Sequence, residues 1–309
     1  MVKRACPICG NGEESKVFAE ANFNLKELDQ FAFASRKLPE YMHFRLIDCP
    51  TCDVVYANPT FSIQEIATAY EEADFGSQEE ARFAAHTYGR FLTGIIPNLA
   101  DLEGALDIGT GDGAFLEVLL TKGFTQVNGI EPSKAPIRAA KKEIQPLIKK
   151  GLFNSRSYHK NTFSLVTCFQ TLEHLADPME TVLGIYQILK EKGALFIVSH
   201  NREALSARVL GRKSPIFDIE HLQLFSFQSV KNLMEKAGFS HIDVKPIFNT
   251  YPLHYWLKLL PVPTKLKTSM FDWLNKTGIG KWPVALPAGN MAVVGYKQTV
   301  THLKRNIKF

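Results

Sequence analysis

Four cysteines near the N-terminus have the residue type and the spacing of a metal site. Cys6 and Cys9 are separated by two residues, and Cys49 and Cys52 repeat this spacing. Two residues between thiolates allow both sulfurs to reach one tetrahedral ion, and two such pairs complete a four-cysteine zinc site. Thiolates then fill every ligand position, so we expect a structural zinc ion rather than a catalytic one. A redox-active pair is the alternative, but it needs only one Cys-x-x-Cys beside a βαβ unit.

A turn rich in glycine is the second stretch that could do chemistry. Residues 105–108 are an apolar run typical of a buried strand, Gly109, Gly111 and Gly113 follow it, and residues 114–120 begin an amphipathic helix. Glycines allow a ligand to approach the backbone closely, and the first turn of a helix offers N–H groups that have no partner within the helix. The stretch therefore predicts a site for a nucleotide-like cofactor.

Two acidic residues narrow the choice of cofactor. Glu131 follows the apolar run 127–130, where its carboxylate could accept hydrogen bonds from two ribose hydroxyls. Asp107 precedes the glycines, and a carboxylate there would repel a pyrophosphate but could attract an amino group or a sulfonium. A dinucleotide fingerprint also needs a glycine where this chain has Ala114. An NAD(P)-dependent enzyme is therefore disfavoured.

These motifs together resemble those of a known enzyme family. The Asp-x-Gly-x-Gly-x-Gly turn and its acidic partner are similar to motif I of the class I S-adenosylmethionine (SAM)-dependent methyltransferases. Residues 172–178, Leu-Glu-His-Leu-Ala-Asp-Pro, resemble the small-molecule branch of that family that includes ubiquinone-biosynthesis-like enzymes. The Asn/Asp-Pro-Pro-Tyr/Phe of amino-methylating nucleic-acid enzymes is absent at this position. The resemblance covers about residues 100–300, and zinc knuckles precede such a domain in some sugar and natural-product methyltransferases.

The resemblance implies SAM as the cofactor and gives a role to each residue around it. The backbone of the glycine turn and Asp107 would hold the methionine part of SAM, and Glu131 would bind the ribose hydroxyls. Asn154 would bind the adenine edge, and Gln170 would lie beside the sulfonium. The implied cofactor-binding set is Asp107, Gly109, Gly111, Gly113, Glu131, Asn154 and Gln170.

Histidines that follow predicted strands are candidates for the base of a methyl transfer. SAM already carries an activated methyl group, so the protein has to align the acceptor and remove its proton. A histidine suits that step because its pKa lies near neutral pH. His174 is the first candidate, His221 is the second, and Glu173 would orient the base or share its role. A structural or helix-capping role for these residues is the alternative.

The order of the predicted elements indicates an α/β fold. Apolar runs predict seven strands, at residues 105–108, 127–130, 149–153, 163–169, 193–200, 242–248 and 291–296. Capping residues and periodicity predict helices over residues 62–73, 78–96, 114–120, 133–144, 177–190 and 226–238. The third strand has the weakest pattern. The resemblance implies a Rossmann-like seven-stranded sheet in the order 3-2-1-4-5-7-6, preceded by a zinc-ribbon-like module.

The chain divides into three predicted segments. Residues 1–60 form the zinc-binding module, residues 61–100 a helical linker or lid, and residues 101–309 the SAM-dependent methyltransferase domain. Within the module, residues 31–43 suit either a substrate-recognition loop or a solvated connector. Within the last segment, residues 249–290 are too long for a hairpin turn and are rich in aromatic residues and lysine. This insertion suits an acceptor-site lid, a packing helix, or a contact with an anionic membrane or a lipid-linked substrate.

Composition sets further bounds. The 309 residues are 45% apolar, which is ordinary for a protein with a sizeable core. We expect a cytoplasmic protein, with a peripheral position at the membrane as the alternative, because the sequence has no run of 18 apolar residues and no apolar region typical of a signal peptide. The net charge of +5 is uneven, since residues 245–309 carry ten Lys or Arg and one acid, a net +9, which leaves −4 for residues 1–244. Paired cysteines without a disulfide pattern indicate a reducing compartment.

The expected function is SAM-dependent methyl transfer to a hydroxyl or an activated carbon of a small molecule. Nucleotide sugars, polysaccharide precursors and quinone-like lipids are the acceptor classes that fit. Two alternatives stay open: an RNA methyltransferase, because aromatic and basic residues also suit single-stranded nucleic acid, and a SAM-binding scaffold protein without acceptor chemistry. The sequence has no RNA-binding module signature, which argues against nucleic acid as a partner.

Overall fold

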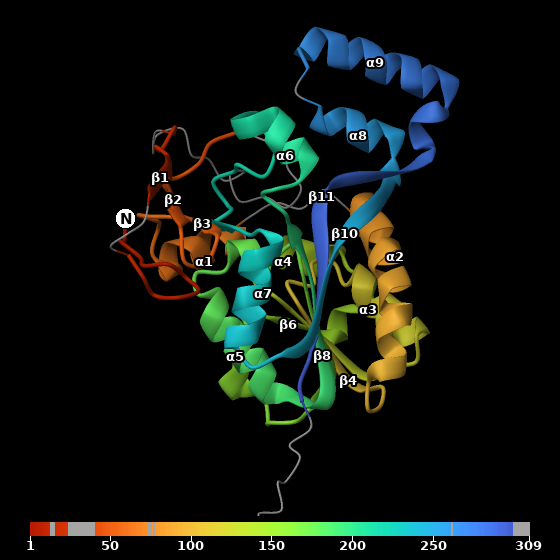
Figure 1. The fold of residues 1–309 in the computed structure, drawn as a ribbon. Helices are drawn as coiled ribbons and strands as arrows, with labels where there is room; N and C mark the ends of the chain where they lie inside the picture. The colour runs from red at the N-terminus through yellow and green to blue at the C-terminus, as the bar shows by residue number, and fades with distance from the viewer. Residues whose placement is uncertain (13–15, 24–40, 73–75, 77, 261, 299–309) are drawn as a thin grey trace, which may run out of the picture.

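The computed structural model describes residues 1–12, 16–23, 41–72, 76, 78–260 and 262–298 (Figure 1). Its centre is a seven-stranded sheet with helices on both faces. The strands of this sheet are β4 (Glu103–Ile108), β5 (Thr125–Glu131), β6 (Ile148–Lys150), β7 (Phe163–Phe169), β8 (Leu189–His200), β10 (Ser240–Pro252) and β11 (Pro283–Tyr296). Most of the loop expected at residues 31–43 lies outside the described residues.

The strands of the central sheet lie in the order β10-β11-β8-β7-β4-β5-β6. Counted in chain order within this sheet, the order from the β6 edge is 3-2-1-4-5-7-6. The pairs among β4, β5, β6, β7 and β8 are parallel, whereas β11 is antiparallel to both of its neighbours. The Rossmann-like α/β fold is confirmed. The carboxyl ends of its parallel strands meet at one edge, which is where open α/β sheets bind ligands.

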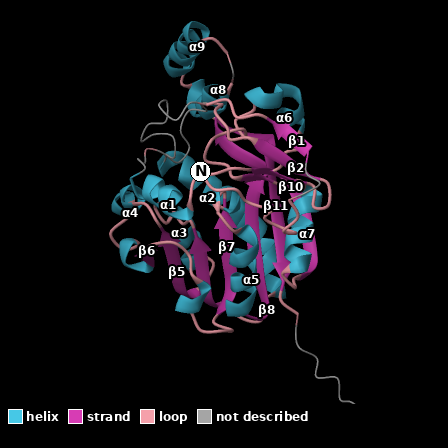
Figure 2. Ribbon diagram, turned by 90° about the vertical axis from the view of Figure 1, so that its left-hand side faces the viewer, coloured by secondary structure: helices cyan, strands magenta, loops and turns pink. Residues whose placement is uncertain are grey.

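Two apolar cores lie between the central sheet and the helices on its two faces; Figure 2 shows the strands of this sheet and the surrounding helices. Successive side chains of a strand point to opposite faces, and β7 accordingly contributes Leu165 to one core and Val166 to the other. Helices α2 and α3 cover the first face, and α5 and α7 cover the second. The helices are α1 (Ile63–Glu72), α2 (Gln78–Ile95), α3 (Ala114–Thr121), α4 (Lys134–Ala139), α5 (Pro178–Ile188), α6 (Leu205–Leu210), α7 (Phe227–Lys236), α8 (Leu253–Leu259) and α9 (Thr264–Thr277).

A second, antiparallel sheet carries the N-terminal cysteines. Its order is β1-β2-β3-β9, and its strands are β1 (Lys16–Ala19), β2 (Leu46–Cys49), β3 (Val54–Ala57) and β9 (Gln223–Leu224). β9 lies far along the chain, after β8, and pairs with β3 through Val55 and Leu224. The N-terminal segment is thus joined to the rest of the fold by backbone pairing. The segment boundaries expected at residues 60 and 100 stay a prediction.

Helix α4 is shorter than the expected helix over residues 133–144. It ends at Ala139, and the backbone of Ala140 is extended. The side chain of Gln145 donates to the carbonyls of Arg138 and Ala140, so it satisfies acceptors that a longer helix would use. The following residues then place Ile144 against Gly113, in the glycine turn after β4. Packing against that turn therefore outweighs the local helical pattern.

The insertion expected at residues 249–290 begins as an extension of the sheet. β10 and β11 stay paired as far as Pro252 and Pro283, so the two strands form a ribbon beyond the other strands. Helices α8 and α9 connect them at the far end of the ribbon (Figure 1). Among the helices that the structure describes, none has the length and the apolar character needed to cross a membrane.

Candidate active site

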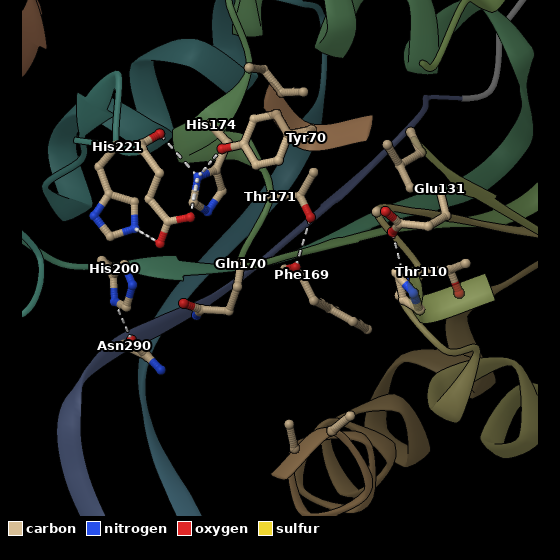
Figure 3. A pocket seen from close by; sticks show the side chains of 18 of the residues that line it. Tyr70, Thr110, Glu131, Phe169, Gln170, Thr171, His174, His200, His221 and Asn290 are labelled. Carbon is tan, nitrogen blue, oxygen red and sulfur yellow. Dashed lines mark hydrogen bonds and ion pairs between the residues drawn. The ribbon is translucent and has the colours of Figure 1, made fainter. Parts of the chain in front are cut away.

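A cavity of about 650 Å³ lies at the carboxyl ends of β4, β5, β7 and β8. Figure 3 shows Glu131 at one end of the cavity and His174, His200 and His221 at the other, with Gln170 between them. Residues of α1, α2 and α8 complete its wall. One cavity therefore brings the glycine turn and the predicted histidines together.

The glycine turn after β4 has backbone angles that favour glycine. The φ angles of Gly109, Gly111 and Gly113 are 74°, 59° and 74°. A Cβ at Gly109 would collide with Thr171, and one at Gly113 would collide with Ile144. At Gly111, no described heavy atom lies within 4 Å of such a Cβ, and this residue lines the cavity. Two glycines thus serve packing, and the middle one leaves the backbone open to a ligand.

The carboxylate of Glu131 is fixed by the turn. One oxygen accepts the Gly111 N–H and the other accepts the Ser133 N–H, each at 2.9 Å. The side chain is buried but lines the cavity. Burial raises the pKa of this carboxyl from 4.5 to about 7. Each oxygen keeps a second lone pair for a hydroxyl donor, as a ribose would provide.

Asp107 forms a second carboxyl group on the cavity wall. It is buried near the end of β4, and its Oδ1 accepts the hydroxyl hydrogen of Thr167 at 2.6 Å. Burial raises the pKa of this carboxyl from 3.8 to about 6. Most Asp107 side chains are therefore ionised at pH 7. The wall presents negative charge to a cationic ligand.

Gln170 and Asn154 differ in where the structure places them. Gln170 follows β7 with a φ of 48°, lines the cavity, and has a buried Nε2 without a hydrogen-bond partner among the described residues. Such strain and unmet polar groups are typical of binding sites. Asn154 is not on the cavity wall; its side chain accepts the Arg156 N–H at 3.0 Å, whereas Leu152 and Phe153 line the cavity. The adenine role of Asn154 stays a prediction.

The turn after β7 and the segment before β9 bring His174 and His221 together. Their ring centroids are 4.9 Å apart. Nδ1 of His174 lies 2.9 Å from the hydroxyl oxygen of Tyr70 on α1 and 3.1 Å from the carbonyl oxygen of Glu220. Nδ1 of His221 lies 2.8 Å from the carbonyl oxygen of Ile216. Burial lowers the pKa of His174, so its imidazole is neutral at pH 7.

A third histidine, His200 at the end of β8, completes this group. Its ring centroid lies 5.0 Å from that of His221, and its Nδ1 lies 2.8 Å from Oδ1 of Asn290. Glu173 is fully buried behind the histidines and accepts the hydroxyl hydrogen of Ser199 at 2.9 Å. Its Oε1 lies 3.8 Å from Nε2 of His200. Three imidazoles thus line the cavity next to a buried carboxylate.

The family model described as a methyltransferase domain matches residues 79–244 of this chain. The chain belongs to the methyltransferase domain family. The matched residues include the glycine turn, Glu131 and the three histidines, so most of the cavity wall is part of this domain. The prediction of a methyltransferase domain is confirmed.

Curated relatives of this methyltransferase domain are ubiquinone biosynthesis O-methyltransferases. The protein of that name from Actinobacillus pleuropneumoniae is 31% identical over 107 residues, which cover 31% of this chain and 45% of the relative. The one from Thiobacillus denitrificans is 32% identical over 107 residues, which cover 33% of this chain and 46% of the relative. The chain spans about half the length of the curated relatives it matches.

Solved structures similar to this chain also include methyltransferases. A SAM-dependent methyltransferase of Thermotoga maritima, described as a possible histamine N-methyltransferase, is 19% identical with a TM-score of 0.47 and covers 71% of this chain and 92% of its own. Phosphoethanolamine N-methyltransferase 2 of Haemonchus contortus, solved with SAM, is 12% identical with a TM-score of 0.45 and covers 79% of this chain and 62% of its own.

The four N-terminal cysteines gather outside the matched domain. One sulfur from each of them lies within 4.8 Å of the other three. The cluster comprises Cys6, Cys9, Cys49 and Cys52. Burial raises the pKa of Cys6 to about 12, so a buried thiolate needs a nearby positive charge. Cys168, the fifth cysteine, is buried in β7 and is not in the cluster.

The sequence prediction missed four polar residues at the histidine end of the cavity. Tyr70, His200, Glu220 and Asn290 line the cavity near His174 and His221. Glu220 is adjacent to His221 in the sequence, and His200 ends a predicted strand, so both had a usable signal. Tyr70 and Asn290 had none, because α1 and β11 reach the site only through the tertiary fold.

Proposed function

We propose that this chain transfers the methyl group of SAM to a small-molecule acceptor in the cavity. The observation that carries the proposal is that one cavity joins two chemically different ends. The end at Glu131 suits a nucleoside with a cationic amino-acid tail, and the histidine end suits removal of a proton. Membership of the methyltransferase domain family supports methyl transfer as the reaction.

At the cofactor end, each carboxylate has a distinct partner in SAM. Glu131 would accept the two ribose hydroxyls with the lone pairs that its backbone donors leave. Asp107 would face the cationic methionine part, whose chain passes the open backbone at Gly111. Gln170, between the two ends, would lie beside the sulfonium, and its buried Nε2 would be available to an acceptor atom of the bound ligands.

At the acceptor end, His174 would act as the general base. The Glu220 carbonyl can only accept, so Nδ1 of His174 carries the proton and Nε2 carries the lone pair of the neutral ring. As the acceptor atom attacks the methyl carbon, its proton passes to this nitrogen and S-adenosylhomocysteine departs. His221 is the second candidate, and Glu173 supports the group from behind.

The acceptor would be a hydroxyl or an activated carbon on a molecule with an apolar or ring-shaped part. Tyr251, Tyr255 and Trp256 line the cavity and pack on one another. Such a wall suits a quinone-like lipid or the base of a nucleotide sugar. A polysaccharide precursor without a ring of this kind would make fewer contacts with it. The names of the curated relatives favour the quinone-like lipid.

A binding titration followed by a transfer assay tests this function. The purified chain should bind SAM with a micromolar dissociation constant by calorimetry and should not bind NAD. Labelled methyl groups from SAM should then appear on a quinone-like phenol or a nucleotide sugar. A folded chain without affinity for SAM would contradict the proposal. SAM binding without transfer to any acceptor class would favour a scaffold protein.

The N-terminal cluster would hold a structural zinc ion. Four sulfurs within 4.8 Å of one another suit tetrahedral thiolate coordination. One pair of cysteines lies in the N-terminal turn, and the other pair lies at the end of β2 and in the turn before β3. An ion bound by both pairs would therefore fix β2 and β3 against the N-terminal turn. Its contribution would be to folding, since thiolates fill every position.

One face of α9 would contact an anionic membrane surface from the cytoplasmic side. Leu266, Met270 and Trp273 recur at the spacing of a single helix face and are 52%, 37% and 57% exposed. Lys276 and Lys281 are also exposed nearby. We name Leu266, Met270 and Trp273 the α9 stripe. Because α8 lines the cavity, a lipid-linked acceptor could pass from the membrane into the site.

A further inference from the structure

We propose that Glu173, His200 and His221 bind a divalent metal ion at the acceptor end of the cavity. One potential ligand atom from each residue lies within 4.8 Å of the other two. Two imidazoles and one carboxylate form a ligand set that suits Zn²⁺, Fe²⁺ or a similar ion and leaves coordination positions open. This site shares no residue with the four-cysteine cluster.

In each ring, Nδ1 contacts an oxygen that accepts, and Nε2 faces a carboxylate. Nε2 of His221 lies 4.0 Å from Oε1 of Glu220, and Nε2 of His200 lies 3.8 Å from Oε1 of Glu173. Nδ1 of His221 faces the Ile216 carbonyl, which only accepts, so this nitrogen carries the proton. Nδ1 of His200 faces Oδ1 of Asn290, which is also an acceptor. In the tautomer that these contacts favour, the lone pair is therefore on Nε2. Metal-binding histidines nearly always have such an outer partner.

Glu173 supplies the negative charge that a cation would compensate. Its carboxylate is fully buried, and its hydrogen bonds come from the Ser199 hydroxyl and the His200 N–H. In the part of the chain that the structure describes, no lysine or arginine forms an ion pair with it. Oε1 and Nε2 of His200 are 3.8 Å apart. Ligand atoms bonded to one ion at about 2.1 Å lie about 3–3.5 Å apart, so ion binding would draw these atoms together from separations of up to 4.8 Å.

The open positions of the ion would hold oxygen atoms of the acceptor. His200 and His221 line the cavity, whereas Glu173 lies behind them, so an ion between the three would face the cavity. This arrangement favours an acceptor with two neighbouring oxygens, such as a catechol or a vicinal diol, which can bind one ion through both. His174 is then free of metal and keeps the role of base. The choice of acceptor rests on the proposed function, whereas ion binding does not.

A cobalt titration of the zinc-loaded full chain tests the site. Only one molar equivalent of zinc is added first, so that it fills the cysteine cluster, and binding of Co²⁺ is then followed by calorimetry and visible absorption. We expect one Co²⁺ per chain, with d–d bands but no new thiolate-to-cobalt band. Glu173→Gln, His200→Gln and His221→Gln should each weaken Co²⁺ binding at least tenfold. Asn290→Ala, which removes the outer partner of His200, should weaken it about tenfold.

The matched control is His86→Gln, because His86 is an exposed histidine of α2 and does not belong to the proposed metal site. This control should bind Co²⁺ like the wild type. Glu173→Gln conserves the shape of the side chain, so it is the ligand variant with the least risk of failing to fold. A wild-type chain that binds SAM but does not bind Co²⁺ would overturn the metal site and leave the proposed function intact. Undiminished Co²⁺ binding by His200→Gln and His221→Gln would overturn it as well. Co²⁺ binding as expected, with no methyl transfer to any acceptor, would contradict the proposed function instead.

Discussion

The hydroxyl oxygen of Tyr70 lies 2.9 Å from Nδ1 of His174, and this contact joins α1 to the turn after β7. Tyr70 precedes the matched domain at residues 79–244, so a residue outside that domain holds the first candidate base. The contact occupies Nδ1, so Nε2 is the nitrogen of His174 that can accept a proton. Helix α1 is therefore part of the acceptor end and does more than connect two segments.

Replacing His174 tests its role as the base. We expect His174→Gln to lower kcat by about 10²–10⁴-fold, the usual contribution of a general base, with little change in SAM affinity. Tyr70→Phe should lower kcat by about 2- to 12-fold, which corresponds to one lost hydrogen bond. Steady-state kinetics with calorimetric SAM binding as control checks both. Equal activity in His174→Gln would assign the base to another residue.

The pH dependence of kcat should follow the neutral form of His174. Burial lowers the pKa of this imidazole from 6.5, and only the neutral ring can accept a proton. The rate should therefore stay high at pH 6.5 and fall only as the pH drops further, through the lowered pKa. A rate profile for wild type and His174→Gln checks this, since the acid limb should vanish in the variant.

Binding of SAM should weaken below neutral pH because Glu131 becomes protonated. With a pKa of about 7, only the ionised carboxylate can accept both ribose hydroxyls. We expect SAM affinity to fall about tenfold between pH 8 and pH 6, whereas Glu131→Gln should bind weakly at both. The raised pKa also means that the ligand-free fold favours the protonated carboxyl. That contribution to the free energy of unfolding is complete below pH 4.5 and is lost as the pH rises through about 7.

Alanine substitutions in the glycine turn should separate packing from binding. Gly113→Ala should lower Tm strongly, because the new Cβ would collide with Ile144. Gly111→Ala has space around it, so it should destabilise the fold by only about 1–2 kcal/mol from its positive φ. Its methyl group would point into the cavity and should weaken SAM binding at least tenfold. Thermal unfolding and calorimetry of the two variants distinguish these effects.

Removal of zinc should destabilise the N-terminal sheet. Cys52→Ser should lower the zinc content by one ion per chain, whereas Cys168→Ala should leave it unchanged, because Cys168 lies in β7. Zinc affinity should fall as the pH falls, since the thiols must lose their protons to bind. Elemental analysis with thermal unfolding checks this. A zinc-free wild-type chain with an unchanged Tm would contradict the structural role.

Binding to anionic vesicles tests the α9 stripe. Trp273→Ser should weaken binding to vesicles that contain anionic lipid about tenfold, which corresponds to the loss of one large apolar contact. Leu183→Ser is the matched control, because Leu183 is 41% exposed on α5, on a different part of the molecule. Vesicle co-sedimentation measures both variants. Equal binding by Trp273→Ser and wild type would remove the membrane role.

Local patterns predicted which residues lie at the Glu131 end of the cavity, whereas their role in cofactor binding stays a prediction. A buried strand, a glycine turn and a helix occupy one continuous stretch, so Asp107 and the three glycines lie on the cavity wall or pack beside it. Glu131 also lies there, because adjacent parallel strands end at the same edge. Asn154 is not on the wall, because the short β6 ends at Lys150 and the residues just after it take that place.

The acceptor end was only partly predictable, because its residues come from distant segments. His174 and His221 were predicted from their motifs, but Tyr70 and Asn290 reach them from α1 and β11. No local periodicity records such a contact. The same limit applies to α4, whose end is fixed by packing of Ile144 on the glycine turn.

The pairing of β3 with β9 also constrains the order in which the chain folds during synthesis. The first three strands of the N-terminal sheet are complete by Ala57, but their fourth strand begins at Gln223, which the ribosome delivers much later. Contacts so distant in sequence form slowly. We therefore expect one edge of β3 to lack its β9 partner while the parallel strands are synthesised. We expect Glu220 and His221, just ahead of β9, to reach their final positions only at that late step. The acceptor end would then be among the last parts of the chain to fold.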